Sequence, residues 1–273
     1  MKHRRALALL AAIAAMALVP STASAWAPAD SATIHPGVQT ETEGGQCTSN
    51  FIYTSGSDVL IGQAAHCSGT GAATETNGCD SGSLPLGTKV NVSGASHPGT
   101  MVYNSWLAMQ AAGERDADTC DYNDLALVKL DPADVGQVNP SVPGFGGPNG
   151  VGGAGPGADV FSYGNSSLRL GLTQTSPKQG KVVSVDGDGW SRTVYTATPG
   201  IPGDSGSAFL NASGQALGTL STVAIAPTPA SNGVADIGKE LDYARAHGLS
   251  GLAVVNGTEG FTPDTVGAVL GAG

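Results

Sequence analysis

The stretch Pro202-Gly203-Asp204-Ser205-Gly206-Ser207 is the most informative part of this 273-residue chain. Glycines on both sides of the Asp-Ser pair let a carbonyl group approach the backbone, and the N–H groups of Gly203 and Ser205 can converge on a developing oxyanion. A lone Gly-Asp-Ser-Gly is also compatible with an ordinary β-turn. Its interpretation as a nucleophile loop therefore depends on the segments upstream of it.

Two upstream segments contain the side chains that a serine nucleophile needs. Gly62-Gln63-Ala64-Ala65-His66-Cys67 follows a predicted strand, and Asp124 opens the apolar run 125–130. Alone, His66 would be interpreted as a structural or surface residue, and Asp124 would be interpreted as a turn residue at the start of a strand. Together, an imidazole can accept the serine proton while a carboxylate orients the ring and stabilises its cation. Since His66 and Asp124 lie in the first half of the chain and Ser205 in the second, we expect a site between two β units.

The overall composition excludes several classes of protein. Charged residues make up 12% of the chain, and 12 Lys and Arg stand against 22 Asp and Glu, a formal charge of −10. This acidity argues against a binder of nucleic acid or anionic membranes, which uses basic residues to meet phosphates. The apolar content of 40% argues against a disordered chain. With 41 glycines, the composition predicts a loop-rich, mostly β protein.

The first 25 residues predict a signal peptide. Lys2, Arg4 and Arg5 precede the apolar run 6–19, and the small residues 23–25 form a cleavage pattern. A membrane anchor is the alternative, but this run is too short to span a bilayer comfortably. We expect secretion, with cleavage after Ala25, to an extracellular location. The mature chain then has 9 basic and 22 acidic residues, a formal charge of −13 over 248 residues.

The four cysteines, Cys47, Cys67, Cys79 and Cys120, are an even number in a chain expected outside the cell, which predicts two disulfides with three possible pairings. A zinc site is less compatible, because the chain has no C-x-x-C pair. Sequential pairing would close loops of 20 and 41 residues and stabilise the fold by roughly 3 and 4 kcal/mol. A bond between Cys47 and Cys67 would also fix the backbone beside His66.

The mature chain consists of short β-like runs separated by turn residues. Residues 51–53 and 59–61 predict a hairpin, and residues 186–189 predict a tight hairpin turn, because an EF-hand would need Glu where Ala197 stands. Glycine and proline crowd the stretch 140–157, which predicts a connection between two strand-rich halves. Residues 234–247 have helical spacing, and we expect this late helix to be the only one.

The His66, Asp124 and Ser205 segments resemble the three signatures of the trypsin-like (chymotrypsin-fold) serine proteases, in that family's order. The resemblance extends from about Gly44 to about His247, and the alanine- and glycine-rich, lysine-poor composition resembles that of actinobacterial members. It implies an all-β fold of two six-stranded antiparallel β-barrels with a C-terminal helix and an active site between the barrels.

The resemblance also implies roles for individual residues. Ser205 would be the nucleophile, His66 the general base and then acid, and Asp124 the orienting carboxylate. The N–H groups of Gly203 and Ser205 would form the oxyanion hole. The stretch Leu217–Ser221 is similar to the family's strand that pairs with substrate backbone, which would place Ser221 near the three catalytic residues. We expect the sequential disulfides Cys47-Cys67 and Cys79-Cys120.

On this basis we divide the chain into six segments. They are a signal peptide (1–25), an N-terminal leader (26–46), a first β-barrel with His66 and Asp124 (47–140), an inter-barrel connection (141–157), a second β-barrel with Ser205 and the C-terminal helix (158–248), and a tail with no readable role (249–273).

Four features depart from animal trypsins. Ser207 stands at a position usually held by Gly, and no cysteine follows Cys120 to brace the second barrel. Pro199, followed by Gly200, stands where trypsins carry the Asp that selects Lys or Arg, so we expect an uncharged residue at the cleavage point and assign both residues to substrate binding. No Lys or Arg occurs between Arg5 and Lys89, so we expect no trypsin-style activation cut. Asp204 would then need a partner other than a new N-terminus.

We therefore expect a secreted, monomeric serine endopeptidase that acts on polypeptides. It needs no cofactor or metal and binds neither nucleic acid nor, after signal cleavage, a membrane. A non-catalytic binding module on the same fold is one alternative, although such relatives generally lose a triad member. A serine-dependent esterase is another, but Ser207 breaks the G-x-S-x-G pattern of the α/β-hydrolases and their chain order is Ser, Asp, His. Esterase activity as a side reaction of the same site stays open.

Overall fold

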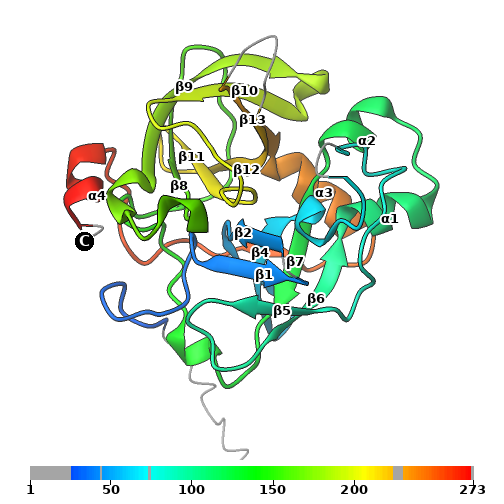
Figure 1. Ribbon diagram of the computed structural model, residues 1–273, viewed down its shortest axis with the longest axis horizontal. Coiled ribbons are helices and arrows are strands. Elements are labelled where there is room, and N and C mark those ends of the chain that lie inside the picture. Colours follow the sequence, from blue (N-terminus) through cyan, green and yellow to red (C-terminus); the bar gives the residue numbers. More distant parts are fainter. Residues whose placement is uncertain (1–25, 44, 73–74, 224–229, 272–273) are drawn as a thin grey trace, which may run out of the picture.

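The structure is a computed structural model that describes residues 26–43, 45–72, 75–223 and 230–271. The expected signal peptide, residues 1–25, lies outside the described residues. The described chain forms two β units in succession, and one helix, α3 (Ile237–Ala246), lies beside both (Figure 1). Nowhere in these described ranges is a helix long and apolar enough to cross a membrane.

The remaining elements follow in chain order. They are β1 (Gln39–Thr42), β2 (Gly45–Thr48), β3 (Ile52–Ser55), β4 (Asp58–Ala64), β5 (Lys89–Val92), β6 (Gly99–Asn104), α1 (Ser105–Ala112), α2 (Ala117–Tyr122), β7 (Leu125–Lys129), β8 (Asp159–Tyr163), β9 (Pro177–Asp186), β10 (Ser191–Thr196), β11 (Ala208–Asn211), β12 (Ala216–Val223), β13 (Asn232–Asp236), β14 (Ala253–Val254) and α4 (Thr265–Gly271).

The first unit is an antiparallel sheet of eight strands in the order β14-β3-β4-β7-β6-β5-β1-β2. The predicted hairpin is confirmed, because β3 and β4 pair with Ile52 opposite Ile61. Ile61 lies opposite Val128 of β7, which lies opposite Met101 of β6. These apolar residues meet on one face of the sheet and are fully buried, as the alternation of side chains along strands requires.

The second unit is a closed antiparallel barrel of six strands in the order β10-β13-β12-β11-β8-β9. Its interior is filled by valine and leucine side chains and one phenylalanine: Val160, Val182, Val194, Phe209, Leu217, Leu220 and Val234. The turn at residues 187–189 joins β9 to β10, as expected for a hairpin. The predicted all-β architecture of two antiparallel units is confirmed, and the second unit is the predicted closed six-stranded barrel. The first unit differs from the prediction of six strands, because β14 and the hairpin β1-β2 belong to a sheet of eight strands.

One hydrophobic cluster joins the two units and helix α3. It contains Phe51 and Leu125 from the first unit, Leu210 from the second, and Ile237 and Leu241 from α3. Helix α3 begins three residues later than the start of the predicted range, because residues 234–236 complete β13. The packing of all three parts on shared apolar side chains fixes the units relative to one another, and hence any site between them.

Three sequence-based expectations need correction. The expected leader contains β1 and the start of β2, because Thr40 pairs with Cys47 in this hairpin and with Val92 of β5. The expected tail is part of the fold, because Ala253 of β14 pairs with Thr54 of β3. The late helix is not the only one, since helices α1, α2 and α4 are also present.

Candidate active site

His66 and Asp124 are brought together by the pairing of strands β4 and β7. Ala64 at the end of β4 lies opposite Leu125 at the start of β7, and the Ala65 N–H donates to the Asp124 carbonyl at 2.8 Å. His66 lies in the short 3₁₀ turn that follows β4. Its Nδ1 is 2.7 Å from Asp124 Oδ2, and its backbone N–H donates to Oδ1 at 2.9 Å. The carboxylate therefore holds both the ring and the backbone of His66.

The hydrogen bond at Nδ1 leaves Nε2 of His66 as the nitrogen that can accept a proton. The His66 side chain is 26% exposed, whereas that of Asp124 is 5% exposed. Burial alone would lower the pKa of His66, but the charge of Asp124 and its hydrogen bond outweigh burial and raise the pKa above 6.5. The pair is thus an accessible base supported by a buried carboxylate.

Ser221 adds a third hydrogen bond to the Asp124 carboxylate. It lies on β12, in the second unit, and its hydroxyl donates to Asp124 Oδ2 at 2.6 Å. This bond crosses from one β unit to the other. It satisfies the buried oxygen that also pairs with the His66 ring.

The Ser205 loop lies against the first unit at the base of the His66 turn. The Ser205 carbonyl accepts the Thr48 N–H at 2.8 Å, and the Gly206 N–H donates to the Leu220 carbonyl at 2.7 Å. Gly206 has a φ of +88°, and a Cβ there would lie 2.8 Å from the Ala64 nitrogen. Only glycine allows this close approach. Within the described ranges no hydrogen bond joins the Ser205 hydroxyl to the His66 ring.

Gly203 is fixed through its carbonyl group. This carbonyl accepts the Thr48 hydroxyl at 2.8 Å and the Gln46 side-chain amide at 3.0 Å. Gly203 has a φ of +94°, in the region that favours glycine. The N–H groups of Gly203 and Ser205 have no hydrogen-bond acceptor among the residues that the structure describes. They remain available to an oxygen atom outside the protein.

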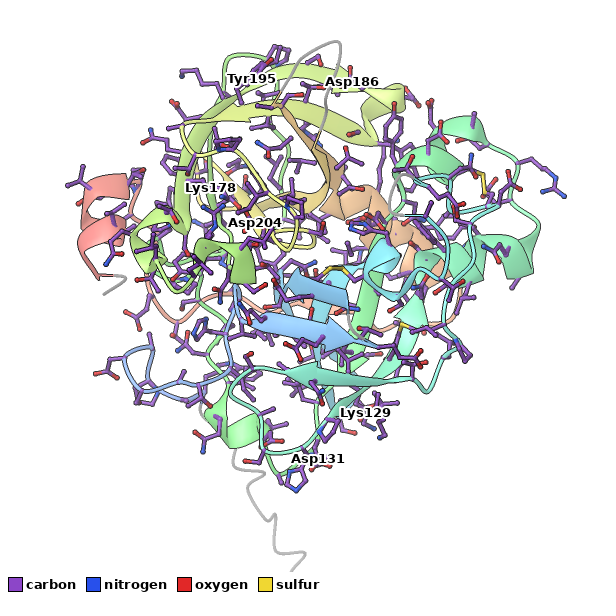
Figure 2. All side chains as sticks on the ribbon, in the orientation of Figure 1. Lys129, Asp131, Lys178, Asp186, Tyr195 and Asp204 are labelled. Carbon is purple, nitrogen blue, oxygen red and sulfur yellow. A yellow bond between two sulfur atoms is a disulfide. The ribbon has the colours of Figure 1, made fainter. Side chains whose placement is uncertain are left out.

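Asp204 is fully buried and has two cationic partners in the second unit, Arg169 and Lys178. Figure 2 shows Lys178 and Asp204 close together. The Arg169 guanidinium contacts its Oδ2 directly, and Lys178 Nζ lies 3.1 Å from the same oxygen. The N–H groups of Ser166 and Ile201 donate to the carboxylate at 3.1 and 3.2 Å. Neither cation was predicted from the sequence.

The expected substrate-binding residues Pro199 and Gly200 lie just before this loop. The Gly200 N–H donates to Asn232 Oδ1 at 2.8 Å, and Asn232 is fully buried at the start of β13. The Pro199 carbonyl is 3.5 Å from Lys178 Nζ. Asn232, which was not predicted from the sequence, therefore anchors this segment to the neighbouring strand.

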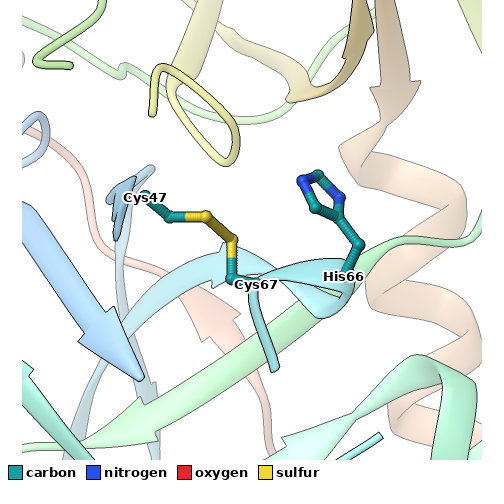
Figure 3. A group of neighbouring side chains, drawn as sticks. All are labelled: Cys47, His66 and Cys67. Carbon is teal, nitrogen blue, oxygen red and sulfur yellow. A yellow bond between two sulfur atoms is a disulfide. The ribbon is translucent and has the colours of Figure 1, made fainter. Parts of the chain in front are cut away.

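The disulfides join Cys47 to Cys67 and Cys79 to Cys120, the sequential pairing. Figure 3 shows the first of them beside the His66 ring. A nitrogen of this ring and the two sulfur atoms lie within 4.8 Å of one another, a spacing that would suit a metal ion if the thiols were free. Both sulfurs are used in the disulfide, which therefore ties the backbone next to His66 to strand β2 instead.

No protein-family model matches this chain, and no curated protein matches it in sequence. Solved structures do match. Thermobifida fusca Protease A is 20% identical with a TM-score of 0.52, and the alignment covers 82% of this chain and 99% of that one. Nocardiopsis protease (NAPase) is 18% identical with a TM-score of 0.51, covering 81% of this chain and 98% of that one. The chain therefore has the two-barrel fold of the chymotrypsin-like serine proteases.

Proposed function

We propose that the chain is a serine endopeptidase that cleaves polypeptides through an acyl-enzyme formed on Ser205. The observation that supports this most strongly is the hydrogen-bonded set of His66, Asp124 and Ser221, contributed by both β units, beside the Ser205 loop. An imidazole held by a buried carboxylate next to a serine on a glycine-flanked loop is the arrangement that acyl transfer requires.

In the proposed reaction, Ser205 Oγ attacks the peptide carbonyl while His66 Nε2 accepts the hydroxyl proton. The N–H groups of Gly203 and Ser205 donate to the oxyanion, which is consistent with their having no protein acceptor in the described chain. His66 then gives the proton to the leaving amine as the C–N bond breaks. Water, deprotonated by the same imidazole, attacks the acyl-enzyme, and the proton returns to Ser205 as the acid product leaves.

We further propose a preference for an uncharged side chain at the cleavage point. The expected pocket segment 199–202 contains no charged residue, and the nearby cation, Lys178, is paired with Asp204. The Asn232 amide is bonded to Gly200 and adds no net charge. A peptide library should be cut mainly after uncharged residues. Cleavage mainly after Lys, Arg, Asp or Glu would contradict the preference while leaving the reaction type intact.

We also propose that the chain becomes active without a trypsin-style activation cut and the new amino terminus that such a cut makes. In support of this, Asp204 already has Arg169 and Lys178 as partners from within the second barrel. We propose export with cleavage after Ala25. Amino-terminal sequencing of active secreted protein should therefore find a start near residue 26, and a start well beyond Gly45 would contradict the proposal.

The test of the function uses an unfolded protein substrate and two serine variants. Ser205→Ala should abolish hydrolysis. Ser207→Ala is the matched control, because this serine lies two positions away, is fully buried, and has a hydroxyl with no hydrogen-bond partner in the described chain. The control should keep the wild-type rate. Equal rates for wild type and Ser205→Ala would contradict the proposal, as would no hydrolysis by the correctly folded wild type.

A further inference from the structure

Glu240 is a buried carboxylic acid that the proposed reaction does not use. It lies on helix α3 and is 0% exposed. Its Oε1 accepts the backbone N–H of Asp124 at 3.0 Å. Its Oε2 lies 3.2 Å from the Thr219 hydroxyl on β12. Glu240 is therefore in direct contact with the residue that orients His66, through the backbone of that residue rather than its carboxylate.

A buried polar network continues beyond Glu240. The Thr219 hydroxyl also lies within 3.4 Å of the Asn50 side-chain amide, whose oxygen accepts the Tyr53 hydroxyl at 2.8 Å. Asn50, Tyr53 and Thr219 are all fully buried. The network thus contains residues of the first unit, of strand β12 in the second unit and of helix α3. Glu240 connects it to the Asp124 backbone.

No cation balances the Glu240 carboxyl within the described chain. The charged or titratable groups that face it are Asp124, Asp236, Tyr53 and Tyr103, and helix α1, packed against α3, has no titratable side chain. Burial raises the pKa of Glu240 well above 4.5, and the negative charges of Asp124 and Asp236 raise it further, against the lowering effect of its two hydrogen bonds.

We propose that Glu240 is a positioning residue that stays protonated in the working enzyme and holds the Asp124 backbone for its contact with His66. This inference rests on the proposed function. With the carboxylate ionised, the Thr219 hydroxyl donates to Oε2, and protonation of Oε2 reverses this bond, so that the acid hydrogen is donated to Thr219 Oγ1 while Oε1 still accepts the Asp124 N–H. A neutral acid makes both contacts without placing a second negative charge beside Asp124. Such a charge would titrate together with the Asp124–His66 pair and shift the pKa of His66.

Two substitutions separate the charge of Glu240 from its shape. Glu240→Gln keeps an oxygen for the Asp124 N–H and a donor for Thr219, and it has the same charge as a protonated Glu. We expect its kcat to stay within about threefold of wild type and the pH midpoint of its rate to stay unchanged. Glu240→Leu leaves the Asp124 N–H without an acceptor, so kcat should fall about tenfold or more while KM changes little. Glu259→Gln, which removes an exposed carboxylate bonded to Thr258 and not to Asp124, is the charge control.

A spectroscopic measurement tests the protonation state without any activity assay. The infrared spectrum of the full chain near neutral pH should contain the carbonyl band of a neutral carboxylic acid, and Glu240→Gln should lack it while Glu259→Gln retains it. This result also stands if Glu240→Leu fails to fold, and if the chain proves inactive. The proposed function can thus fail while Glu240 is still found protonated, and Glu240 can be found ionised while the proposed function stands.

Three results would overturn the inference. One is the absence of a neutral-acid band that Glu240→Gln removes. Another is a shift of the pH midpoint by more than about half a unit in Glu240→Gln, because removal of an ionised carboxylate would change the pKa of His66 by such an amount. The third is a folded Glu240→Leu variant with lower thermal stability but wild-type kcat and pH midpoint, which would reduce Glu240 to a structural role.

Discussion

The buried cluster of Arg169, Lys178 and Asp204 holds the loop that carries Ser205, and substitution of Arg169 tests how. Arg169→Met removes the guanidinium and keeps most of the volume of the side chain. Asp204 then retains Lys178 at 3.1 Å and the N–H groups of Ser166 and Ile201. The Asp204 carboxylate therefore keeps one positively charged partner and two hydrogen bonds, but it loses its direct contact with the guanidinium.

The magnitude follows from the burial of these groups. The side chains of Arg169 and Asp204 are 9% and 0% exposed, and removal of one partner of such a buried pair costs about 3–5 kcal/mol. Because Lys178 remains, we expect a loss at the lower end, about 3 kcal/mol, and a melting temperature lower by roughly 6–12 °C. Asp204 lies between the two proposed oxyanion donors, so a displacement of about 1 Å should also lower kcat about 100-fold.

Guanidinium unfolding followed by tryptophan fluorescence measures the stability, and initial rates on a peptide substrate measure kcat. Lys181→Met is the matched control, because Lys181 lies on the same strand as Lys178 and pairs with Asp159 while 61% exposed. An exposed pair of this kind is worth at most about 1 kcal/mol. If Arg169→Met loses no more stability than the control and keeps its kcat, the reasoning about the buried cluster is refuted.

Three further predictions concern the rest of the site. The rate should fall with decreasing pH through a midpoint above 6.5, because pairing with Asp124 raises the pKa of His66 and only the neutral ring accepts the serine proton. A midpoint at or below 6.5 in a pH–rate profile would contradict this. Ser221→Ala should lower kcat about tenfold by removing a hydrogen bond of about 1.5 kcal/mol to a carboxylate, and an unchanged kcat in steady-state assays would count against that role. Replacement of Cys79 and Cys120 by Ala should lower the unfolding free energy by about 4 kcal/mol, because it opens a 41-residue loop, and should leave kcat unchanged in the folded protein. A loss of unfolding free energy below about 1 kcal/mol in chemical denaturation would contradict the loop argument.

The site residues that stand within a recognisable sequence motif could be predicted from that motif alone. His66, Asp124 and the Ser205 loop each stand in a distinctive run of small or apolar residues. Glu240 has only a weak signal of this kind: it stands three residues after Ile237 and one before Leu241, on the apolar face of the predicted helix. Its contact with Asp124 spans 116 positions, and only the packing of α3 on both units creates it.

The same distinction applies to the fold. The short apolar runs 51–53, 59–61 and 125–130 predicted the central strands β3, β4 and β7. Strand β1, Gln-Thr-Glu-Thr, lacks large apolar residues, so its buried threonines gave no pattern to detect. Helix α1 was missed although its ends carry ordinary signals. The Asn104 side chain accepts the Trp106 N–H, and Gly113 ends the helix with a φ of +67°.

The most direct test of the central claim is covalent labelling of the intact chain by a fluorophosphonate, which reacts only with a serine activated by its surroundings. Mass spectrometry of the labelled protein should find one probe per molecule, on the peptide containing Ser205. Ser207→Ala should label like wild type, and Ser205→Ala should not label. Labelling of Ser205→Ala to the same extent as wild type, or none in folded wild type, would contradict the assignment of Ser205 as the nucleophile.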